Sequence, residues 1–137
     1  MKKKSKENHA RLGTKIKQKL VFKVLHGLFV AVPLVAGVDK YFNMITDWER
    51  YISPVVKPLL PMSTKTAMRC AGIAEVAIGL KTLKQPRVGA SLFSLLMLGI
   101  ILNLLTMPKQ KHIASLDFCM AIFASSFVLL LPDTEEM

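Results

Sequence analysis

The stretch from Val88 to Met107 is 20 residues long, contains no charged side chain and is almost entirely apolar. A helix of about 20 residues reaches across the roughly 30 Å hydrocarbon core of a bilayer. The whole chain is 52% hydrophobic and only 20% charged, whereas a soluble domain usually has about a quarter charged residues. The stretch therefore predicts a membrane-spanning helix, and it argues against a disordered chain or an ordinary soluble enzyme.

Three other stretches have a comparable length and composition: Leu20–Val38, Thr66–Leu83 and Ile113–Leu131. The first contains only Lys23 and His26 as titratable groups, and Lys23 lies close enough to its basic end to reach the lipid headgroups. The last contains a single acid, Asp117. Both are therefore predicted to span the membrane as well.

The stretch Thr66–Leu83 is the weakest of the four because it carries Arg69 and Glu75. A charge at the centre of an isolated helix costs about 2.5–3.5 kcal/mol on insertion. We expect this helix to cross the membrane only as an interior member of a bundle. The alternative is a helix in the core of a soluble domain.

These patterns predict an all-α fold: an integral membrane four-helix bundle with an interfacial loop between helices 1 and 2. The domain organisation is a basic arm at 1–19, a four-span membrane domain at 20–131 and an acidic tail at 132–137. The connection Asp39–Lys65 contains the only tryptophan, Trp48, both tyrosines and three prolines. Tryptophan and tyrosine favour the headgroup level, so we expect a short amphipathic turn at Phe42–Ile52 and then a proline-broken cap.

Most of the net charge of +10 lies at the N-terminus, where residues 1–23 contain nine Lys and Arg against one acid, Glu7. A basic segment that leads into a first apolar helix is typical of a cytosolic flank held near anionic lipid headgroups. No aromatic residue (Phe, Trp or Tyr) is interleaved with the basic residues up to Lys19, so we do not expect nucleic-acid binding. Four spans place twelve Lys and Arg on the side of both termini and six on the other. This predicts cytosolic N- and C-termini, with the cell membrane as the location.

Helical spacing and depth bring several polar side chains together in the outer half of the predicted bundle. They are Lys40, Arg69, Asn103 and Asp117, with Glu75 deeper, near mid-membrane, and His26 in the inner half. Intramembrane ionisable residues are costly to keep and are functional candidates. One interpretation is a ligand or proton pocket that opens outward. The other is a structural ion pair between Arg69 and Asp117.

Two of these residues carry further expectations. No basic residue is predicted at the depth of Glu75, so we expect burial to keep its carboxyl uncharged. His26 is either a sixth member of the pocket or a hydrogen-bonded helix histidine.

Short motifs in three helices resemble the DoxX-like family of small four-span membrane proteins. They are Gly37–Val38–Asp39–Lys40, Gly72–Ile73–Ala74–Glu75 with Gly79, and an aspartate, Asp117, near the start of the fourth helix. The resemblance covers residues 20–131, and Lys40, Glu75 and Asp117 match the family pattern. The family name derives from a membrane subunit of a thiosulfate:quinone oxidoreductase, so the resemblance implies partnership with a quinone pool.

The leading hypothesis is an accessory subunit of a quinone-linked redox assembly, in contact with a redox partner subunit and with a quinone as its ligand. A second is a scaffold or assembly factor that uses the basic arm and the loop. A third is a small proton-coupled transporter in which Glu75 titrates, and which would need to form a homodimer to enclose a path. The sequence shows no nucleophile–base pair and no metal-binding motif, so we do not expect an enzyme that acts alone.

Overall fold

The computed structural model describes residues 2–131, with side chains from residue 11 onward. It contains four α-helices and no strand in that part of the chain. The helices are α1 (Lys2–Phe42), α2 (Thr64–Lys84), α3 (Pro86–Leu105) and α4 (Lys111–Leu130). The predicted all-α four-helix fold is confirmed, and the helices lie where the apolar stretches placed them. The acidic tail lies outside the described residues.

Local chemistry explains where the helices begin and end. The backbone reaches a positive φ of 50° at Asn43, directly after α1, a conformation that asparagine tolerates better than most residues. The side chain of Ser63 accepts a hydrogen bond from the backbone N–H of Thr66 and caps the start of α2. Pro86 occupies the first turn of α3, where its missing N–H costs nothing. A tight turn at Gln85 therefore joins α2 to α3.

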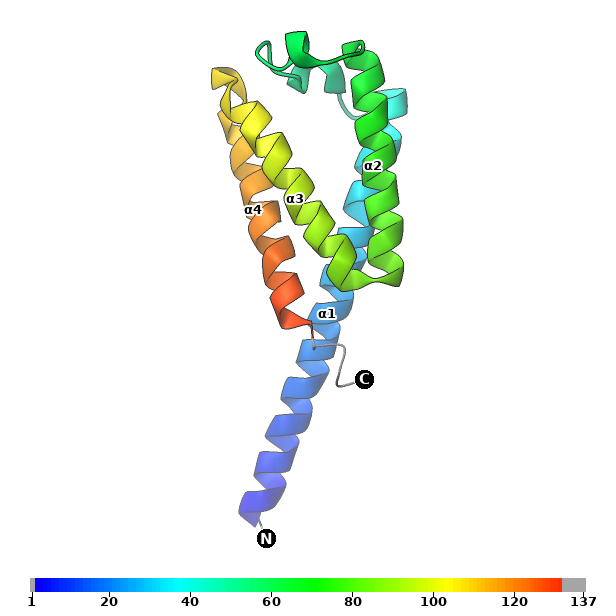
Figure 1. Ribbon diagram of the computed structural model, residues 1–137. Coiled ribbons are helices and arrows are strands. Elements are labelled where there is room, and N and C mark those ends of the chain that lie inside the picture. The colour runs from blue at the N-terminus through cyan, green and yellow to red at the C-terminus, as the bar shows by residue number, and fades with distance from the viewer. Residues whose placement is uncertain (1, 132–137) are drawn as a thin grey trace.

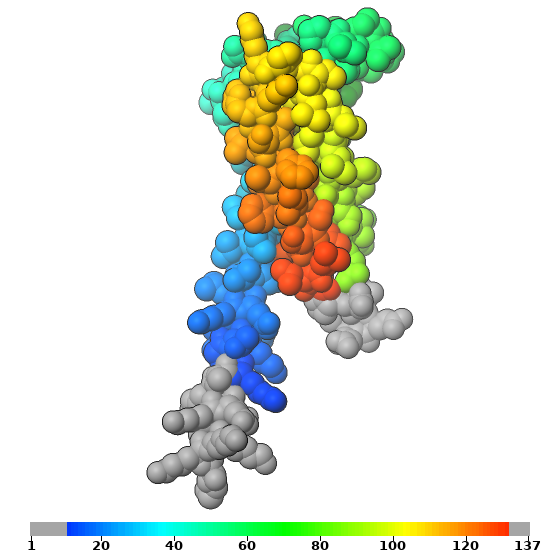
Figure 2. All heavy atoms as spheres, turned by 90° about the vertical axis from the view of Figure 1, so that its left-hand side faces the viewer, coloured from blue at the N-terminus to red at the C-terminus, as the bar shows by residue number. Residues whose placement is uncertain are grey.

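Helix α1 is much longer than the others. Its 41 residues make a rod of about 60 Å at 1.5 Å per residue. Figure 1 shows its N-terminal part projecting beyond the bundle, and Figure 2 shows the part of this extension from residue 11 onward from another side. The segment predicted as a basic arm is thus a helical continuation of the first span. Pro33 lies inside this helix without ending it.

The helices associate as two pairs, because α1 packs mainly on α2 and α3 mainly on α4. Helices α2 and α3 meet at Gln85 and diverge away from it (Figure 1). We call this closed end the turn end, and the opposite end, covered by residues 43–63, the loop end. A Cβ added to Gly37 would lie 2.6 Å from the carbonyl oxygen of Gly72, and the reverse distance is the same. The two backbones are therefore in direct contact, as small residues in membrane helices allow.

Aromatic side chains fill the core toward the turn end. Phe29, Phe93 and Phe127 are almost completely buried. The ring centroids of Phe29 lie 5.8 Å from those of Phe93 and 5.4 Å from those of Phe127, distances typical of packed aromatic pairs. These rings join α1, α3 and α4 into one core.

The outward faces are apolar. Helices α1, α3 and α4 are each long and apolar enough to cross a membrane. Large side chains such as Leu95, Leu102 and Leu116 are exposed on these helices, whereas soluble proteins rarely expose extensive apolar surface. The fold is that of an integral membrane protein.

Helix α2 is not among the three apolar helices. It packs on both α1 and α3, and its Ile73 and Leu80 are exposed, as large apolar side chains are on the other three helices. Only its inward face is fully buried, and that face contains Glu75 between Gly72 and Gly79. A charged residue is thus accommodated by facing α1, while the opposite side of the helix stays apolar.

The connection after α1 forms two 3-10 turns, Trp48–Tyr51 and Lys57–Leu59. The first lies within the predicted turn region at Phe42–Ile52. The second contains Pro58 and lies between Pro54 and Pro61, in the segment predicted as a proline-broken cap. Ile52 and Ser53, which belong to this loop, are buried against the bundle. The loop therefore covers the loop end of the bundle (Figure 1).

Candidate functional site

A cavity of about 820 Å³ lies between the two helix pairs, beneath the loop. Its walls come from all four helices and from the loop, and most of the lining side chains are apolar. Representative apolar side chains are Val32, Ile78, Leu96, Ile100 and Met120. This volume falls in the range of pockets that hold small organic molecules.

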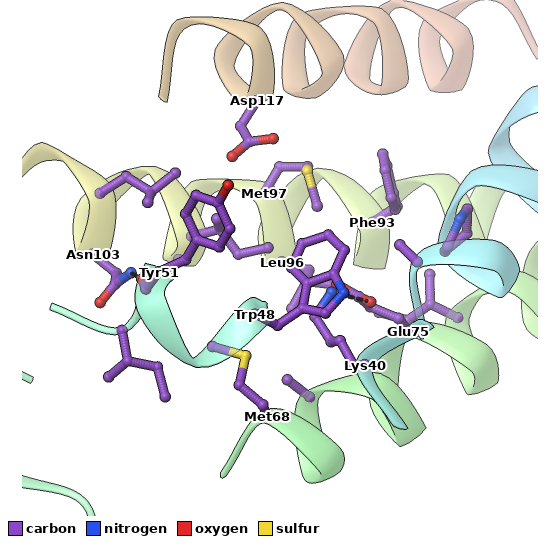
Figure 3. Close-up of a pocket in the computed structure, with 18 of the residues that line it drawn as sticks. Lys40, Trp48, Tyr51, Met68, Glu75, Phe93, Leu96, Met97, Asn103 and Asp117 are labelled. Carbon is purple, nitrogen blue, oxygen red and sulfur yellow. Dashed lines mark hydrogen bonds and ion pairs between the residues drawn. The ribbon is translucent and has the colours of Figure 1, made fainter. Parts of the chain in front are cut away.

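Polar side chains from each wall gather around part of this cavity (Figure 3). Four of the six predicted site residues line it: Lys40, Glu75, Asn103 and Asp117. Trp48 and Tyr51 of the loop also line it, and neither was predicted as a site residue. Arg69 and His26 are not part of its lining.

The amino group of Lys40 and the carboxylate of Glu75 form a buried ion pair. Lys40 Nζ donates a hydrogen bond to Glu75 Oε2 at 2.7 Å, and the two side chains are only 6% and 4% exposed. Our expectation that Glu75 has no basic partner is therefore wrong. The predicted depths in the membrane are those of the backbone, at which Lys40 and Glu75 are well separated. The four-carbon stem of Lys40 is long enough to bring its amino group to Glu75. The contact of Gly37 with Gly72 brings the two helices close enough for this pair.

Trp48 covers the ion pair from the loop side. Lys40 Nζ lies 3.7 Å from the centroid of the indole ring, within the range of a cation–π interaction. Trp48 Nε1 donates a hydrogen bond to Asp39 Oδ2 at 2.7 Å. The other oxygen of Asp39 accepts from the backbone N–H groups of Met44 and Ile45. Asp39 thereby fixes both the end of α1 and the indole that covers Lys40.

Asn103 fastens the loop to α3. Its Oδ1 accepts a hydrogen bond from the backbone N–H of Ser53 at 3.0 Å, and its Nδ2 donates to the carbonyl oxygen of Tyr51 at 2.6 Å. The hydroxyl of Thr106 adds a hydrogen bond to the Ser53 hydroxyl. Both the oxygen and the nitrogen of the Asn103 amide are thus hydrogen-bonded to the loop, so this residue fixes the loop over the cavity.

Asp117 projects from α4 at the cavity and is partly buried. In the described part of the chain its carboxylate forms no hydrogen bond and no ion pair. Figure 3 shows it pointing toward the hydroxyl end of Tyr51. That hydroxyl makes one long hydrogen bond, 3.4 Å, to Thr46.

The structural alternative, an ion pair between Arg69 and Asp117, is wrong. The side chain of Arg69 is exposed and lies near Tyr41, with 5.8 Å from its guanidinium carbon to the ring centroid. Six residues separate Arg69 from Glu75, which turns the two about 120° apart around the helix. When Glu75 faces inward, Arg69 therefore cannot point across the cavity to α4.

His26 lies toward the turn end, away from the cavity. Its Nε2 donates to the carbonyl oxygen of Thr82 at 2.8 Å, and its ring centroid lies 6.4 Å from that of Phe127 in a stacked arrangement. This confirms the interpretation of His26 as a hydrogen-bonded helix histidine. It connects α1 to α2 beside the aromatic core.

The described residues contain no group of three His, Cys, Asp or Glu side chains that could hold a metal ion. The chemistry available at the cavity is that of one ion pair, one carboxylate without a partner, one phenol and a large apolar wall. Compared with protein-family models, with curated proteins and with solved structures, the chain matches none.

Proposed function

We propose that this membrane protein binds a quinone-like ligand in the cavity and acts as an accessory subunit of a quinone-linked redox assembly. The observation that supports this best is the form of the cavity. It is large, its walls are mainly apolar, and its few polar side chains are gathered in one part. An amphiphile with a long apolar body and a small polar head matches that distribution.

The exposed residues of the cavity lining favour a ligand from the membrane over one from water. Two of its lining residues, Leu92 and Leu95, are 41% and 66% exposed. Both belong to α3, one of the three helices apolar enough to span a membrane. A ligand that passes these leucines would come from the hydrocarbon phase, where isoprenoid quinones reside.

The redox role is supported by the resemblance of Lys40, Glu75 and Asp117 to the DoxX-like pattern. In the proposed orientation both termini are cytosolic and the loop end faces the outer side of the cell membrane. The basic part of α1 then contacts anionic headgroups on the cytosolic side, and a redox partner subunit would approach the loop end.

The first experiment asks what the cavity holds. The protein is extracted with its native lipids into nanodiscs, and bound small molecules are identified by native mass spectrometry and solvent extraction. We expect about one quinone per chain. A preparation that carries lipid but no quinone, and that takes up none on addition, would overturn the proposal.

A matched pair of glycines makes this test specific. Gly99 lines the cavity and Gly27 does not, and an added Cβ at either position meets no atom within 4 Å. Gly99→Trp should fill the cavity and remove the bound quinone, whereas Gly27→Trp should leave it. Equal occupancy in the two variants would place the ligand elsewhere.

The second experiment tests the redox role in cells. In a deletion strain complemented with each variant, Gly99→Trp should lower the rate of respiratory quinone reduction and Gly27→Trp should restore the full rate. If both restore it fully, the cavity does not serve quinone chemistry.

The projecting part of α1 favours the scaffold hypothesis as the second candidate. Removing residues 2–19 should then abolish recovery of partner proteins in detergent while ligand occupancy stays unchanged. The transporter hypothesis receives less support, because Gly37 and Gly72 form a tight backbone contact rather than room for helix movement.

A further inference from the structure

The carboxylate of Asp117 is the polar group in the cavity that lacks a partner in the described chain. Glu75 is neutralised by Lys40, Asn103 is occupied by the loop, and the Trp48 N–H is held by Asp39. A carboxylate in a largely apolar cavity is costly unless something donates hydrogen bonds to it. Water can hydrate a carboxylate that is only partly buried, so a ligand that displaces this water from the cavity must itself supply a donor.

The charges around the cavity restrict what that ligand can be. Because Lys40 and Glu75 neutralise each other, the unpaired charge at the cavity is that of Asp117, and it would repel an anionic head. A cationic head would pair with Asp117, but to enter past Leu92 and Leu95 it would have to move from water into hydrocarbon, which is costly for a charge. A head with acceptors only, such as a ketone or an ether, would leave Asp117 without a donor. A neutral head with hydroxyl donors avoids all three conflicts.

We propose that the cavity selects the hydroxyl-bearing, reduced form of its ligand, a quinol, and that Asp117 is the hydrogen-bond acceptor for its head. This inference depends on the proposed function for the ligand class and adds the oxidation state and the residue that distinguishes it. The Tyr51 hydroxyl, toward which Asp117 points, provides a second group that can accept or donate at the same head (Figure 3). The apolar tail then lies along α3, toward Leu92 and Leu95.

The test compares three probes of nearly the same shape, under anaerobic conditions, in nanodiscs. They are a quinol with a two-isoprene tail, the matching quinone, and the dimethyl ether of the quinol, in which both hydroxyls are methylated. Trp48 is the only tryptophan of the chain and lines the cavity, so its fluorescence reports each titration. We expect the quinol to bind about tenfold more tightly than either the quinone or the ether, as befits one hydrogen bond to a charged acceptor.

The variant Asp117→Leu removes the acceptor while keeping an apolar wall. We expect it to bind all three probes with nearly equal affinity, close to that of the ether for the unchanged protein. The control is Ser115→Leu, two residues away on an exposed part of α4, which should keep the tenfold preference. Retained binding of the ether by Asp117→Leu shows that the variant is folded.

The possible results separate the two proposals. If the three probes bind equally to the unchanged protein, the selection of a quinol is wrong and the quinone-like ligand class stands. If the quinone binds most tightly, Asp117 acts as a donor and the inference is overturned. If no probe binds, the proposed function fails, and this inference with it.

Discussion

The turn end of the bundle is packed with aromatic side chains, whereas the loop end contains a polar network and a cavity. At the turn end, Gly89 lies so close to Thr82 that an added Cβ would collide with it. The last turn of α2 and the first turn of α3 are therefore in direct contact. Phe29 and Phe127 then fill the space between the pairs. At the loop end the helices have diverged, and a polar network and a covering loop replace the aromatic core. The same four helices thus provide a packed half that supports the fold and an open half that can hold a ligand.

The sharpest way to test this difference is to truncate one side chain in each half. Phe127→Ala at the turn end should lower the free energy of unfolding by about 3–5 kcal/mol, because it leaves a cavity in a close-packed core. Met120→Ala, on the same helix but lining the existing cavity, should cost about 1 kcal/mol, because its side chain is only partly buried. Unfolding in mixed detergent micelles measures both. Equal losses would mean that the two halves are equally packed.

The ion pair of the loop end should behave as a unit. Lys40→Met leaves the buried carboxylate of Glu75 without its partner and should cost about 3 kcal/mol. Adding Glu75→Leu should recover most of that loss, because a buried ion pair can be replaced by apolar side chains at little cost. The same unfolding assay measures the single and double variants. A double variant that is less stable than Lys40→Met would show that Glu75 has another stabilising partner.

The contact between α1 and α2 can be tested with one methyl group. Gly37→Ala would place a Cβ against the backbone of Gly72 and should cost about 2 kcal/mol by forcing the helices apart. Gly27→Ala, on the same helix with open space around it, should be neutral or stabilising by up to about 1 kcal/mol. Thermal unfolding in one detergent compares them. A neutral Gly37→Ala would contradict the tight backbone contact.

The smallest effect on global stability is expected at the loop attachment. Asn103→Leu removes two hydrogen bonds and should cost about 1 kcal/mol in stability. Hydrogen exchange should rise markedly in residues 43–63 and stay unchanged near Phe93. An equal rise in both regions would show that the loop and the aromatic core unfold together.

The positions of α1, α3 and α4 could be predicted from the sequence because each contains a segment long and apolar enough to span a membrane. The stretch of α2 was predicted as a helix despite Arg69 and Glu75. Lys40, Glu75, Asn103 and Asp117 could also be placed in the loop half of the bundle from helical periodicity and depth. The partner of Glu75 could not, because the reach of a lysine side chain depends on how closely two helices approach. The same limit applies to Arg69, whose direction depends on which face of α2 packs against α1. Trp48 could not be predicted as a site residue because its position depends on the path of a loop, and loops have no periodic sequence pattern.

The attachment of the loop at Asn103 restricts the route by which a ligand enters the cavity. The helix pairs are joined by the chain at one end and by hydrogen bonds at the other, so the cavity has a floor and a roof. A guest would then enter and leave sideways, between α2 and α3, without being hydrated. The occupancy of the cavity would therefore depend on the mole fraction of the ligand among the lipids. Diluting the sample with aqueous buffer would leave that occupancy unchanged.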